Sequence, residues 1–414
     1  MAGALAAAGC RRGDRVAFWL PSSADLLCAV LGAARTGVVP VLLNATLLPA
    51  ERDRLLDDAD PTLSVLDPGA LARLADGPPV DLAPRPLTRP MHYTSGTTGR
   101  PKGVTTGLWD DPTAAAVFDD EADVWGFGPG DLHLVCSPMY HTVSIRFAAG
   151  TLLRGGSLAI LDRFDADVAL DALRQLRPTT TFMAPTHLHR LLASPRLGDA
   201  ERFDSLRLLV HAGSPCPPVL KRAAMDRSDA VWEFYGSTEG QFTVCSPDDW
   251  LAHPGTVGRA RPGRRLTIDG DTIWCHAPEF ARFAYWRNPG ATDAAWRGDA
   301  FTVGDLGHLD DDGYLYLSGR RDDLIISGGV NVYPAEVEAA LLEVPGVDEV
   351  AVVGVPDDAW GQRVVAVVVG DADLDAVRQA ADRRLAPYKR PKEYRRADQL
   401  PHTATGKLIR REVL

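Results

Sequence analysis

Short apolar runs that alternate with helix-length segments constrain the fold of this chain more than any other feature. From Asp14 onward these runs are RVAFWL, VPVLL, DLHLVCS, SLAIL, TTTFM and LRLLVHAG. Because the runs are apolar almost throughout, both faces of each strand are expected to be buried. This pattern predicts an α/β fold in which helices cover mostly parallel sheets. The first of these helices should run from about Ser22, as its N-cap, to Arg35.

The pattern changes twice toward the C-terminus. From about Leu266, the segments RLTIDGDTIWCHA and GHLDDDGYLYLSGR indicate β-hairpins with Asp-Gly turns. After Arg320, the segment NVYPAEVEAALLEV indicates a helix, VDEVAVVGV and RVVAVVVG indicate strands, and LDAVRQAADRRL indicates a second helix. A chain of 414 residues is also too long for one compact core. We predict a large N-terminal domain at 1–321 with a β-hairpin-rich subdomain, and a small mobile α+β domain at 322–414.

Composition excludes several classes of function. The chain has 44 basic and 55 acidic residues, a net charge of −11, which argues against a nucleic-acid partner. It has no apolar run long enough to span a membrane. The six cysteines form neither a C-x-x-C pair nor a zinc-like cluster, which favours a reducing, cytoplasmic location. Only five basic residues are lysines: Lys102, Lys221, Lys389, Lys392 and Lys407. Chance codon usage explains such a bias, but a lysine in an arginine-rich chain can also mark a position where an ammonium is harder to replace by a guanidinium, as we expect for Lys102 and Lys407.

The segment MHYTSGTTGRPKGV, from Met91 to Val104, is rich in glycine and hydroxyl side chains. Glycines allow backbone N–H groups to converge on an anion, and Lys102 can add a positive charge to phosphate. The segment differs from a Walker A loop because Pro101 precedes the lysine and Gly103 follows it. It therefore predicts a phosphate site of another kind, although the same composition also suits a surface turn.

Three later segments carry further candidate residues. In EFYGSTEG, a tyrosine can stack on a base and Glu239 can bind Mg²⁺, although a helix N-terminus has a similar composition. In TVGDLG, Asp305 can accept hydrogen bonds from both hydroxyls of a ribose, with help from Arg320. In LPHTATGKLIRREVL, Lys407 lies on a short loop before a predicted terminal helix, where a lysine is often merely solvated.

These four segments, in this order, resemble the adenylate-forming superfamily of acyl-CoA synthetases, luciferases and peptide-synthetase adenylation domains. The resemblance covers nearly the whole chain. It implies that a carboxylate attacks the α-phosphate of Mg-ATP to give acyl-AMP and pyrophosphate. A thiol, typically that of coenzyme A, then attacks the acyl carbonyl and releases AMP. We therefore expect an acyl-CoA synthetase that uses ATP, Mg²⁺ and coenzyme A.

The resemblance also assigns the nucleotide site. The residues expected at the outer phosphates are Thr94, Ser95, Gly96, Thr97, Thr98, Gly99 and Lys102. Those expected around adenine and the α-phosphate are Gly213, Ser214, Glu233, Phe234, Tyr235, Gly236, Ser237 and Thr238. Asp305 and Arg320 should hold the ribose, and Glu239 should bind Mg²⁺. Lys407 should stabilise charge in the adenylation transition state.

The second half-reaction implies a domain rotation about Asp322, which occupies the hinge position of the family. This rotation would withdraw Lys407 and bring Ser327, Gly328 and Gly329 beside a channel for coenzyme A. The catalytic set is expected to be Lys407, Thr238, Glu239 and His141, although His141 also fits a histidine packed in the core. The residues expected to line the acyl pocket are His141, His187, Ala212, Gly213, Phe234, Gly236 and Gln241.

The pocket segments HAGSPCPP, EFYGSTEG and DDWLAHPGTVGR look most like those of bile-acid and steroid acyl-CoA ligases. Phe234 stands where a dicarboxylate-specific enzyme should offer an arginine, which favours a bulky apolar acid; Arg146 leaves the second possibility open. Two further functions stay open: acyl transfer to a carrier-protein pantetheine or an amine, and non-catalytic nucleotide binding. The chain begins within what is normally a later helix, so apolar surface could be covered in a homodimer.

Overall fold

The computed structural model describes residues 1–94, 101–320, 323–327, 330–357, 361–385, 387, 389–403 and 408–414. The chain divides into two compact units. Unit 1 comprises Met1–Pro254, Gly258–Arg265 and Cys275–Phe301. Unit 2 comprises Gly255–Val257, Leu266–Trp274 and Thr302–Leu414. The proposed domain boundary between residues 321 and 322 stays a prediction.

The first sheet of unit 1 has six strands in the order β15-β5-β4-β2-β1-β3. Its central strands pair in parallel, β1 with β2 and β3, and β2 with β4. At one edge, β4 and β5 form an antiparallel hairpin, and β15 pairs antiparallel with β5. The strands are β1 (Arg15–Phe18), β2 (Val39–Leu42), β3 (Leu63–Val65), β4 (Met91–Thr94), β5 (Lys102–Thr105) and β15 (Ala284–Tyr285).

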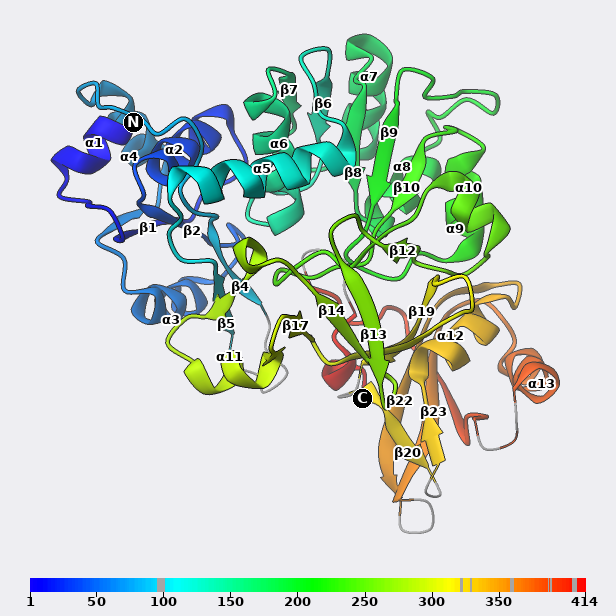
Figure 1. Ribbon diagram of the computed structural model, residues 1–414. Coiled ribbons are helices and arrows are strands. Elements are labelled where there is room, and N and C mark those ends of the chain that lie inside the picture. The colour runs from blue at the N-terminus through cyan, green and yellow to red at the C-terminus, as the bar shows by residue number, and fades with distance from the viewer. Residues whose placement is uncertain are drawn as a thin grey trace. The chain divides into compact units, whose positions relative to one another are not determined.

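The second sheet of unit 1 is entirely parallel, in the order β10-β9-β8-β6-β7 (Figure 1). Residues of β8 and β9 are buried throughout, as expected for strands covered on both faces. The strands are β6 (Leu132–Val135), β7 (Ser157–Ile160), β8 (Thr180–Met183), β9 (Leu208–His211) and β10 (Val231–Glu233). The six apolar runs of the sequence are therefore confirmed as strands.

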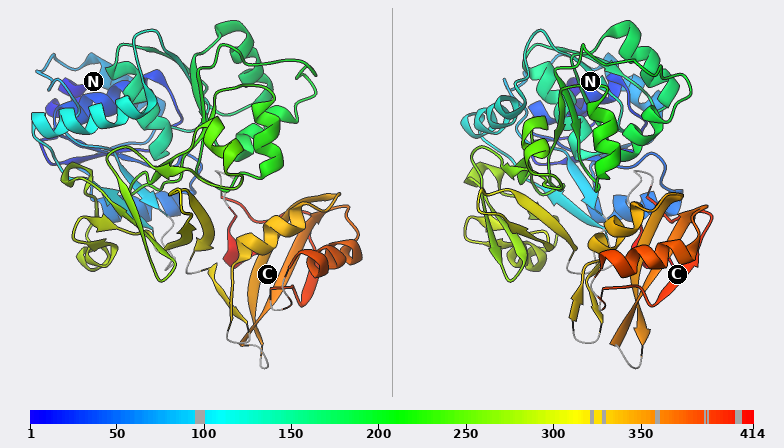
Figure 2. Two further views of the ribbon diagram at one scale, coloured as in Figure 1. Left: turned by 45° about the vertical axis from the view of Figure 1, so that its right-hand side comes forward. Right: turned by 90° about the vertical axis from the view of Figure 1, so that its right-hand side faces the viewer.

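Helices cover the faces of these sheets, as two further views of the ribbon show (Figure 2). A single apolar cluster joins Phe18 of β1, Leu26 of α2, Val135 of β6 and Ile145 of α6. The two sheets therefore share a core rather than forming separate folds. The helices of unit 1 are α1 (Ala2–Ala7), α2 (Ala24–Arg35), α3 (Pro49–Ala59), α4 (Pro68–Arg73), α5 (Asp111–Trp125), α6 (Thr142–Leu153), α7 (Ala166–Leu176), α8 (Pro185–Leu192), α9 (Pro218–Met225), α10 (Pro247–Ala252) and α11 (Pro289–Ala295), with 3₁₀ turns η1 (Leu74–Asp76) and η2 (Glu279–Ala281).

The predicted N-cap of α2 was wrong by one residue. Ser23, not Ser22, accepts the capping hydrogen bond from the Leu26 N–H. The hydroxyl of Ser22 instead accepts a hydrogen bond of 2.9 Å from the backbone N–H of Met139. A contact 117 residues away in sequence decided which serine caps the helix, and no local pattern reveals such a contact.

Short strands follow the second parallel sheet. They include both predicted hairpins: β13 pairs with β14, and β18 pairs antiparallel with β19. The strands are β11 (Thr243–Val244), β12 (Arg259–Ala260), β13 (Arg265–Asp269), β14 (Thr272–His276), β16 (Trp296–Arg297), β17 (Ala300–Phe301), β18 (Asp305–Leu309) and β19 (Leu315–Arg320).

The C-terminal part of unit 2 is a sheet in the order β21-β20-β23-β22, with β24 paired to β23. Its apolar core joins Val337 of α12, Val352 of β22, Val364 of β23 and Val377 of α13. The predicted helices and strands after residue 320 are thus confirmed, except for the terminal helix. In its place, the described residues 408–414 contain a 3₁₀ turn. The elements are β20 (Ile325–Ser327), β21 (Val330–Val332), α12 (Pro334–Leu342), β22 (Val347–Asp357), β23 (Gly361–Gly370), α13 (Leu374–Arg384), β24 (Glu393–Arg396) and η4 (Arg410–Glu412).

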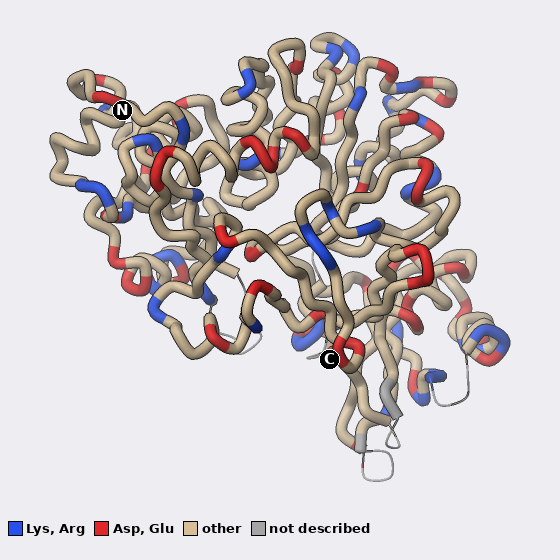
Figure 3. Tube along the Cα trace, viewed as in Figure 1, with Lys and Arg blue, Asp and Glu red and all other residues tan. Residues whose placement is uncertain are grey.

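The fold class is confirmed as α/β with parallel sheets, a hairpin-rich part and a smaller C-terminal part. Basic and acidic residues are interspersed along the trace, although the chain is acidic overall (Figure 3). Within the described residues, no helix is both long enough and apolar enough to cross a membrane.

Candidate active site

The candidate residues of unit 1 cluster where strands end. In a parallel sheet the carboxyl ends of the strands share one edge, which is where ligands of open α/β sheets bind. Thr94 ends β4, His211 ends β9, and Glu233 ends β10. Thr94 also pairs with Lys102 across the β4–β5 hairpin. The hairpin therefore holds both ends of the predicted phosphate loop, whose residues 95–100 lie outside the described part of the chain.

Lys102 and Glu239 are brought together through one aromatic ring. The Lys102 ammonium lies 5.1 Å from the centroid of the Tyr285 ring, an arrangement that favours a cation. The Tyr285 hydroxyl donates a hydrogen bond of 2.8 Å to Oε1 of Glu239. The lysine expected at phosphate and the carboxylate expected at Mg²⁺ thus share a contact residue. Sequence reasoning missed Tyr285, because no motif contains it.

The predicted nucleotide motif EFYGSTEG continues from the end of β10 with an extended backbone. Tyr235 donates its N–H to Thr243 Oγ1 at 3.0 Å, and Gly236 forms a bridge with Gln241. A Cβ atom on Gly236 would lie 2.9 Å from the carbonyl oxygen of Gly240, so this turn requires glycine. Because successive side chains of an extended segment alternate in direction, Glu233 and Tyr235 face one way and Phe234 the other.

A small pocket joins Thr238 and Glu239 to a buried charge cluster. Glu121, at 5% side-chain exposure, lies 2.6 Å from Arg146 Nε and 3.1 Å from Arg89 Nη2. Burial alone would raise the pKa of Glu121, but the two guanidinium groups hold it below its ordinary value. Burial lowers the pKa of Arg89 to about 9, so Arg89 stays charged at neutral pH. The pocket is lined in part by Arg89, His92, Thr142, Arg146, Thr238 and Glu239.

The predicted acyl-pocket residues meet an aromatic cluster. Phe234 and Ala212 belong to one buried apolar cluster, and Phe234 lies 5.8 Å from Trp125 and 6.5 Å from Phe182 between ring centroids. Gln241 is buried and donates from Nε2 to the carbonyl of Thr243 at 3.0 Å. Phe234 therefore packs against a buried apolar and aromatic cluster.

Two histidines predicted to line the pocket are held neutral. Burial lowers the pKa of His141 to about 3, with further lowering from His92 and His187 nearby. Burial also lowers the pKa of His187, to about 4; its ring stacks on Phe164 and its Nδ1 lies 3.1 Å from Ser137 Oγ. Nε2 of His141 is buried and has no hydrogen-bond partner among the described residues. A polar ligand group could supply that partner.

The remaining nucleotide-site residues of unit 1 lie near these strand ends. Gly213 follows His211 and adopts a φ of +94°, a conformation that favours glycine. Ser214 is half-buried, and Ser237 has a buried hydroxyl without a partner among the described residues. These positions agree with a polar site, and their roles stay predictions.

Other predicted residues belong to unit 2 or lie outside the described chain. Asp305 begins β18 and pairs in register with Arg320 at the end of β19. Ser327 ends β20 and is buried at 2% exposure. The predicted residues outside the described part are Ser95, Gly96, Thr97, Thr98, Gly99, Asp322, Gly328, Gly329 and Lys407.

Comparison with known proteins identifies the family. The sequence matches the AMP-binding enzyme family over residues 1–85 and 88–272, and the AMP-binding enzyme C-terminal domain over residues 336–407. The chain belongs to the AMP-binding enzyme family. The superfamily resemblance of its four motifs is thereby confirmed.

Its relatives include characterised acid–CoA ligases. Indoleacetate–CoA ligase of Aromatoleum aromaticum is 34% identical, over 100% of this chain and 90% of that protein. Long-chain-fatty-acid–CoA ligase FadD13 of Mycobacterium tuberculosis is 32% identical, over 98% of this chain and 88% of that protein. The prediction of an AMP-forming acid–thiol ligase is confirmed at this level.

Solved structures show the same fold. ATP-bound MatB from Rhodopseudomonas palustris superposes with a TM-score of 0.87 at 32% identity, covering 99% of this chain and 90% of that one. O-succinylbenzoate coenzyme A synthetase from Bacillus subtilis, in complex with ATP and magnesium ion, gives 0.87 at 28% identity, covering 100% and 91%. The amide bond synthetase McbA from Marinactinospora thermotolerans gives 0.88 at 28% identity, covering 100% of this chain and 91% of that one.

ATP, Mg²⁺ and coenzyme A are the cofactors of this enzyme, and its described residues fit the first two. No three His, Cys, Asp or Glu side chains gather into a metal site within the described residues. An ion at Glu239 would therefore take further oxygen ligands from phosphate and water, as Mg²⁺ commonly does. When bound, Mg-ATP supplies the phosphorus electrophile and the leaving group. Glu239 would hold the ion, and Lys102 would face the phosphates.

Proposed function

We propose that this enzyme converts a bulky, largely apolar carboxylic acid into its coenzyme A thioester through an acyl-AMP intermediate. The observation that carries the choice of acid is the aromatic cluster behind Phe234, which contains Trp125, Phe147 and Phe182. A substrate pocket that borders this cluster would favour flat or apolar acyl groups over charged ones. The indoleacetate–CoA ligase relative supports an aromatic acid in particular.

The charges near this cluster support the same choice. Arg146, which could have received a second carboxylate of the substrate, is already bound to Glu121 at 2.6 Å. Breaking that contact to bind an acid would leave a buried carboxylate with less compensation, at a cost of several kcal/mol. A dicarboxylic acid is therefore disfavoured. Within apolar acids, the bile-acid and steroid subtype rests on the segments HAGSPCPP, EFYGSTEG and DDWLAHPGTVGR.

The roles of the site residues belong to this proposal. His141 would contact the reacting carboxyl group, Thr238 the α-phosphate and Glu239 the Mg²⁺ ion. Lys407 would assist adenylation, and rotation about Asp322 would then place Ser327 beside coenzyme A. The domain ranges 1–321 and 322–414, a cytoplasmic location and a homodimer complete the proposal.

Pyrophosphate release across a panel of acids tests it. The panel should contain fatty, arylacetic, polycyclic and dicarboxylic acids, each with and without coenzyme A. We expect release with the apolar members and a coenzyme A thioester as product. Lys407→Ala should block acyl-AMP formation yet spare thioester formation from supplied acyl-AMP; equal loss in both halves would remove that role. No release with any acid would favour the non-catalytic alternative.

A second candidate is acyl transfer to an amine. The structural similarity to the amide bond synthetase McbA favours it specifically. Carrier-protein pantetheine as the acceptor has the same chemistry as coenzyme A and stays an alternative. Replacing coenzyme A by a set of amines or by a pantetheinylated carrier protein in the same assay separates the three. The acceptor that gives the largest kcat/KM is the one the enzyme uses.

A further inference from the structure

Lys221 and Glu233 form a buried ion pair at the end of β10. The Lys221 ammonium lies 2.6 Å from Oε2 of Glu233. Their side chains are 1% and 10% exposed, so little water screens the pair. Glu233 is the first residue of the nucleotide motif, whereas Lys221 comes from helix α9, outside every motif.

The surroundings of Lys221 hold its ammonium in place. The ring of Trp250 lies 4.9 Å below the ammonium and is itself only 3% exposed. The neighbouring Arg222 stacks on the same ring at 5.0 Å but is exposed. The two cations therefore share one aromatic contact, and only Lys221 points to a carboxylate among the interactions of the described residues.

His211 cannot replace Lys221 as a counter-charge. Its Nε2 lies 3.8 Å from Oε2 of Glu233, and its side chain is fully buried. Burial lowers the pKa of His211 to about 4, so the ring is neutral at physiological pH. Neither ring nitrogen has a hydrogen-bond partner among the described residues. The charge of Glu233 is therefore compensated by Lys221.

Backbone hydrogen bonds also fix the position of Glu233. Glu233 exchanges two backbone hydrogen bonds with Cys245, of 3.0 and 2.8 Å, which fix its position. Two residues later, Tyr235 faces the same way, as alternation in an extended segment requires. Phe242 covers the Tyr235 ring at 4.7 Å between centroids. A base stacked on Tyr235 would therefore lie on the side of the segment that also carries the Glu233 carboxylate.

We propose that Lys221 is a positioning residue that fixes the Glu233 carboxylate as a hydrogen-bond acceptor for the 6-amino group of the purine. This inference rests on the proposed nucleotide site. Because Lys221 binds Oε2, the orientation of the carboxylate is fixed, and its other oxygen is left as an acceptor for the base. An acceptor attracts a 6-amino purine and repels a 6-oxo purine, which has a carbonyl oxygen at that position.

The first test compares ATP with ITP in Lys221→Met. We expect the KM for ATP to rise about 10-fold with kcat changed less than about 3-fold, and the preference for ATP over ITP to fall about 10-fold. Arg222→Met is the matched control, since it removes a cation from the same helix and the same ring. The control should keep the preference of the wild type.

The second test uses the partner. In Glu233→Gln, Lys221 should bind the amide oxygen and leave the NH₂ group facing the base, which shifts preference toward ITP. Adding Lys221→Met frees the amide to rotate, and part of the ATP preference should return. Rescue of this kind requires that Lys221 orient residue 233, because a purely structural role would lower the melting temperature without reversing purine preference.

The outcomes separate this inference from the proposed function. If the Lys221→Met variant has a lower melting temperature but keeps the wild-type preference for ATP over ITP, the positioning role is wrong while the ligase function stands. If the wild type releases no pyrophosphate with any acid, the ligase function fails instead. Calorimetric binding of ATP and ITP to the same variants then decides the positioning role: an unchanged binding ratio overturns it, and a reduced ratio supports it.

Discussion

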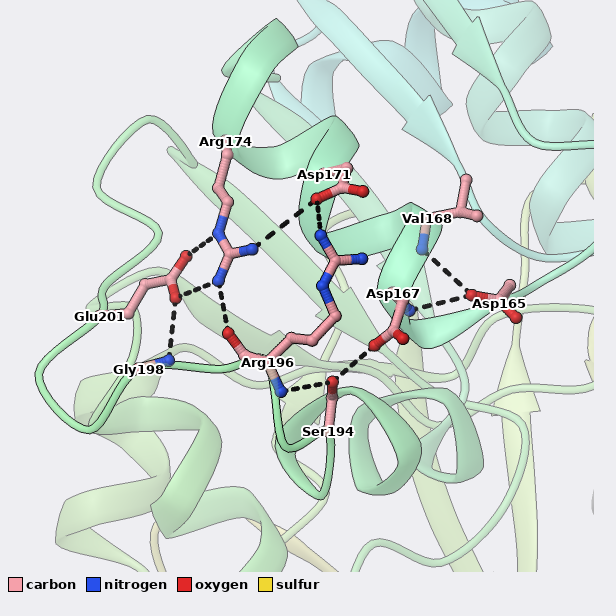
Figure 4. Close-up of polar contacts among 9 residues, drawn as sticks. All are labelled: Asp165, Asp167, Val168, Asp171, Arg174, Ser194, Arg196, Gly198 and Glu201. Carbon is pink, nitrogen blue, oxygen red and sulfur yellow. Dashed lines mark hydrogen bonds and ion pairs between the residues drawn. The ribbon is translucent and has the colours of Figure 1, made fainter.

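Two charged networks in unit 1 have similar contact distances but different surroundings. In the interior, Glu121 joins Arg146 at 2.6 Å and Arg89 at 3.1 Å. On the surface, Arg174 of α7 contacts both oxygens of Glu201 at 2.7 Å (Figure 4). Glu121 is 5% exposed, whereas Glu201 and Arg174 are 21% and 35% exposed. The contact distances alone therefore do not predict how strongly each network stabilises the fold.

The two networks differ in whether water can hydrate a charge whose partner has been removed. When a surface partner is removed, solvent screens and hydrates the remaining charge. When a buried partner is removed, the remaining charge stays in a low-dielectric interior at a cost of several kcal/mol. Only the interior network shares a pocket with Thr238 and Glu239. We expect interior changes to affect stability and catalysis together, and surface changes to affect neither strongly.

The largest effect should come from Glu121→Gln. It leaves the guanidinium groups of Arg89 and Arg146 without their carboxylate, and the free energy of unfolding should fall by about 3–5 kcal/mol. Urea unfolding measures the change. Asp123→Asn is the matched control, because Asp123 lies on the same helix and contacts Arg154 at 3.1 Å while 77% exposed. Equal loss in the two variants would erase the distinction between the networks.

Glu239→Gln should have the next largest effect, on activity rather than stability. The amide cannot bind Mg²⁺ as a carboxylate does, so pyrophosphate release should fall about 100-fold at low Mg²⁺, or about 2.7 kcal/mol. Titration with Mg²⁺ should show a higher requirement. Tyr285→Phe, which removes the hydroxyl bound to Glu239, should give a smaller loss of the same kind. An unchanged Mg²⁺ titration would contradict the metal role.

Acid should destabilise the interior before the surface. Burial lowers the pKa of His133 to about 3 and of His92 to about 4, so both are neutral when folded. Below pH 6.5 the unfolded chain binds protons that the folded chain does not, and each such histidine removes about 1.4 kcal/mol per pH unit. Arg174 holds the pKa of Glu201 at about 2, so its contribution is lost only as pH falls below about 4.5.

Unfolding free energies measured from pH 7 to pH 4.5 check this order. His133→Gln should reduce the slope by about one proton below pH 6, since glutamine does not titrate. The stability of the wild type should begin to fall near pH 6.5. A flat profile down to pH 4.5 would show that the buried histidines do not titrate as neutral groups.

The sequence predicted candidate site residues only where they lie in contiguous motifs. The glycines and hydroxyl side chains from Met91 to Val104 predicted a phosphate loop, but not the hairpin in which Thr94 pairs with Lys102. The apolar runs predicted both parallel sheets, because strands buried on both faces have few polar residues.

Partners from distant segments were not predictable in this way. Glu121 and Arg89 come from different segments, and their contact appears only in the folded chain. Lys221 left one signal, as one of only five lysines in an arginine-rich chain. The rarity of lysine does not identify the partner of Lys221, because Lys221 and Glu233 meet only through the packing of α9 beside β10. Ser22 was assigned to the wrong role for the same reason.

Glu201→Gln should have the smallest effect of all. It weakens the two contacts to Arg174 in Figure 4, but water and neighbouring groups remain available to both side chains. We expect the melting temperature to change by no more than about 2 °C and the kcat/KM for acid to be unchanged. Added salt should shrink even this difference, since exposed charges are screened. A shift as large as that of Glu121→Gln would mean that the surface network is buried in solution by a partner.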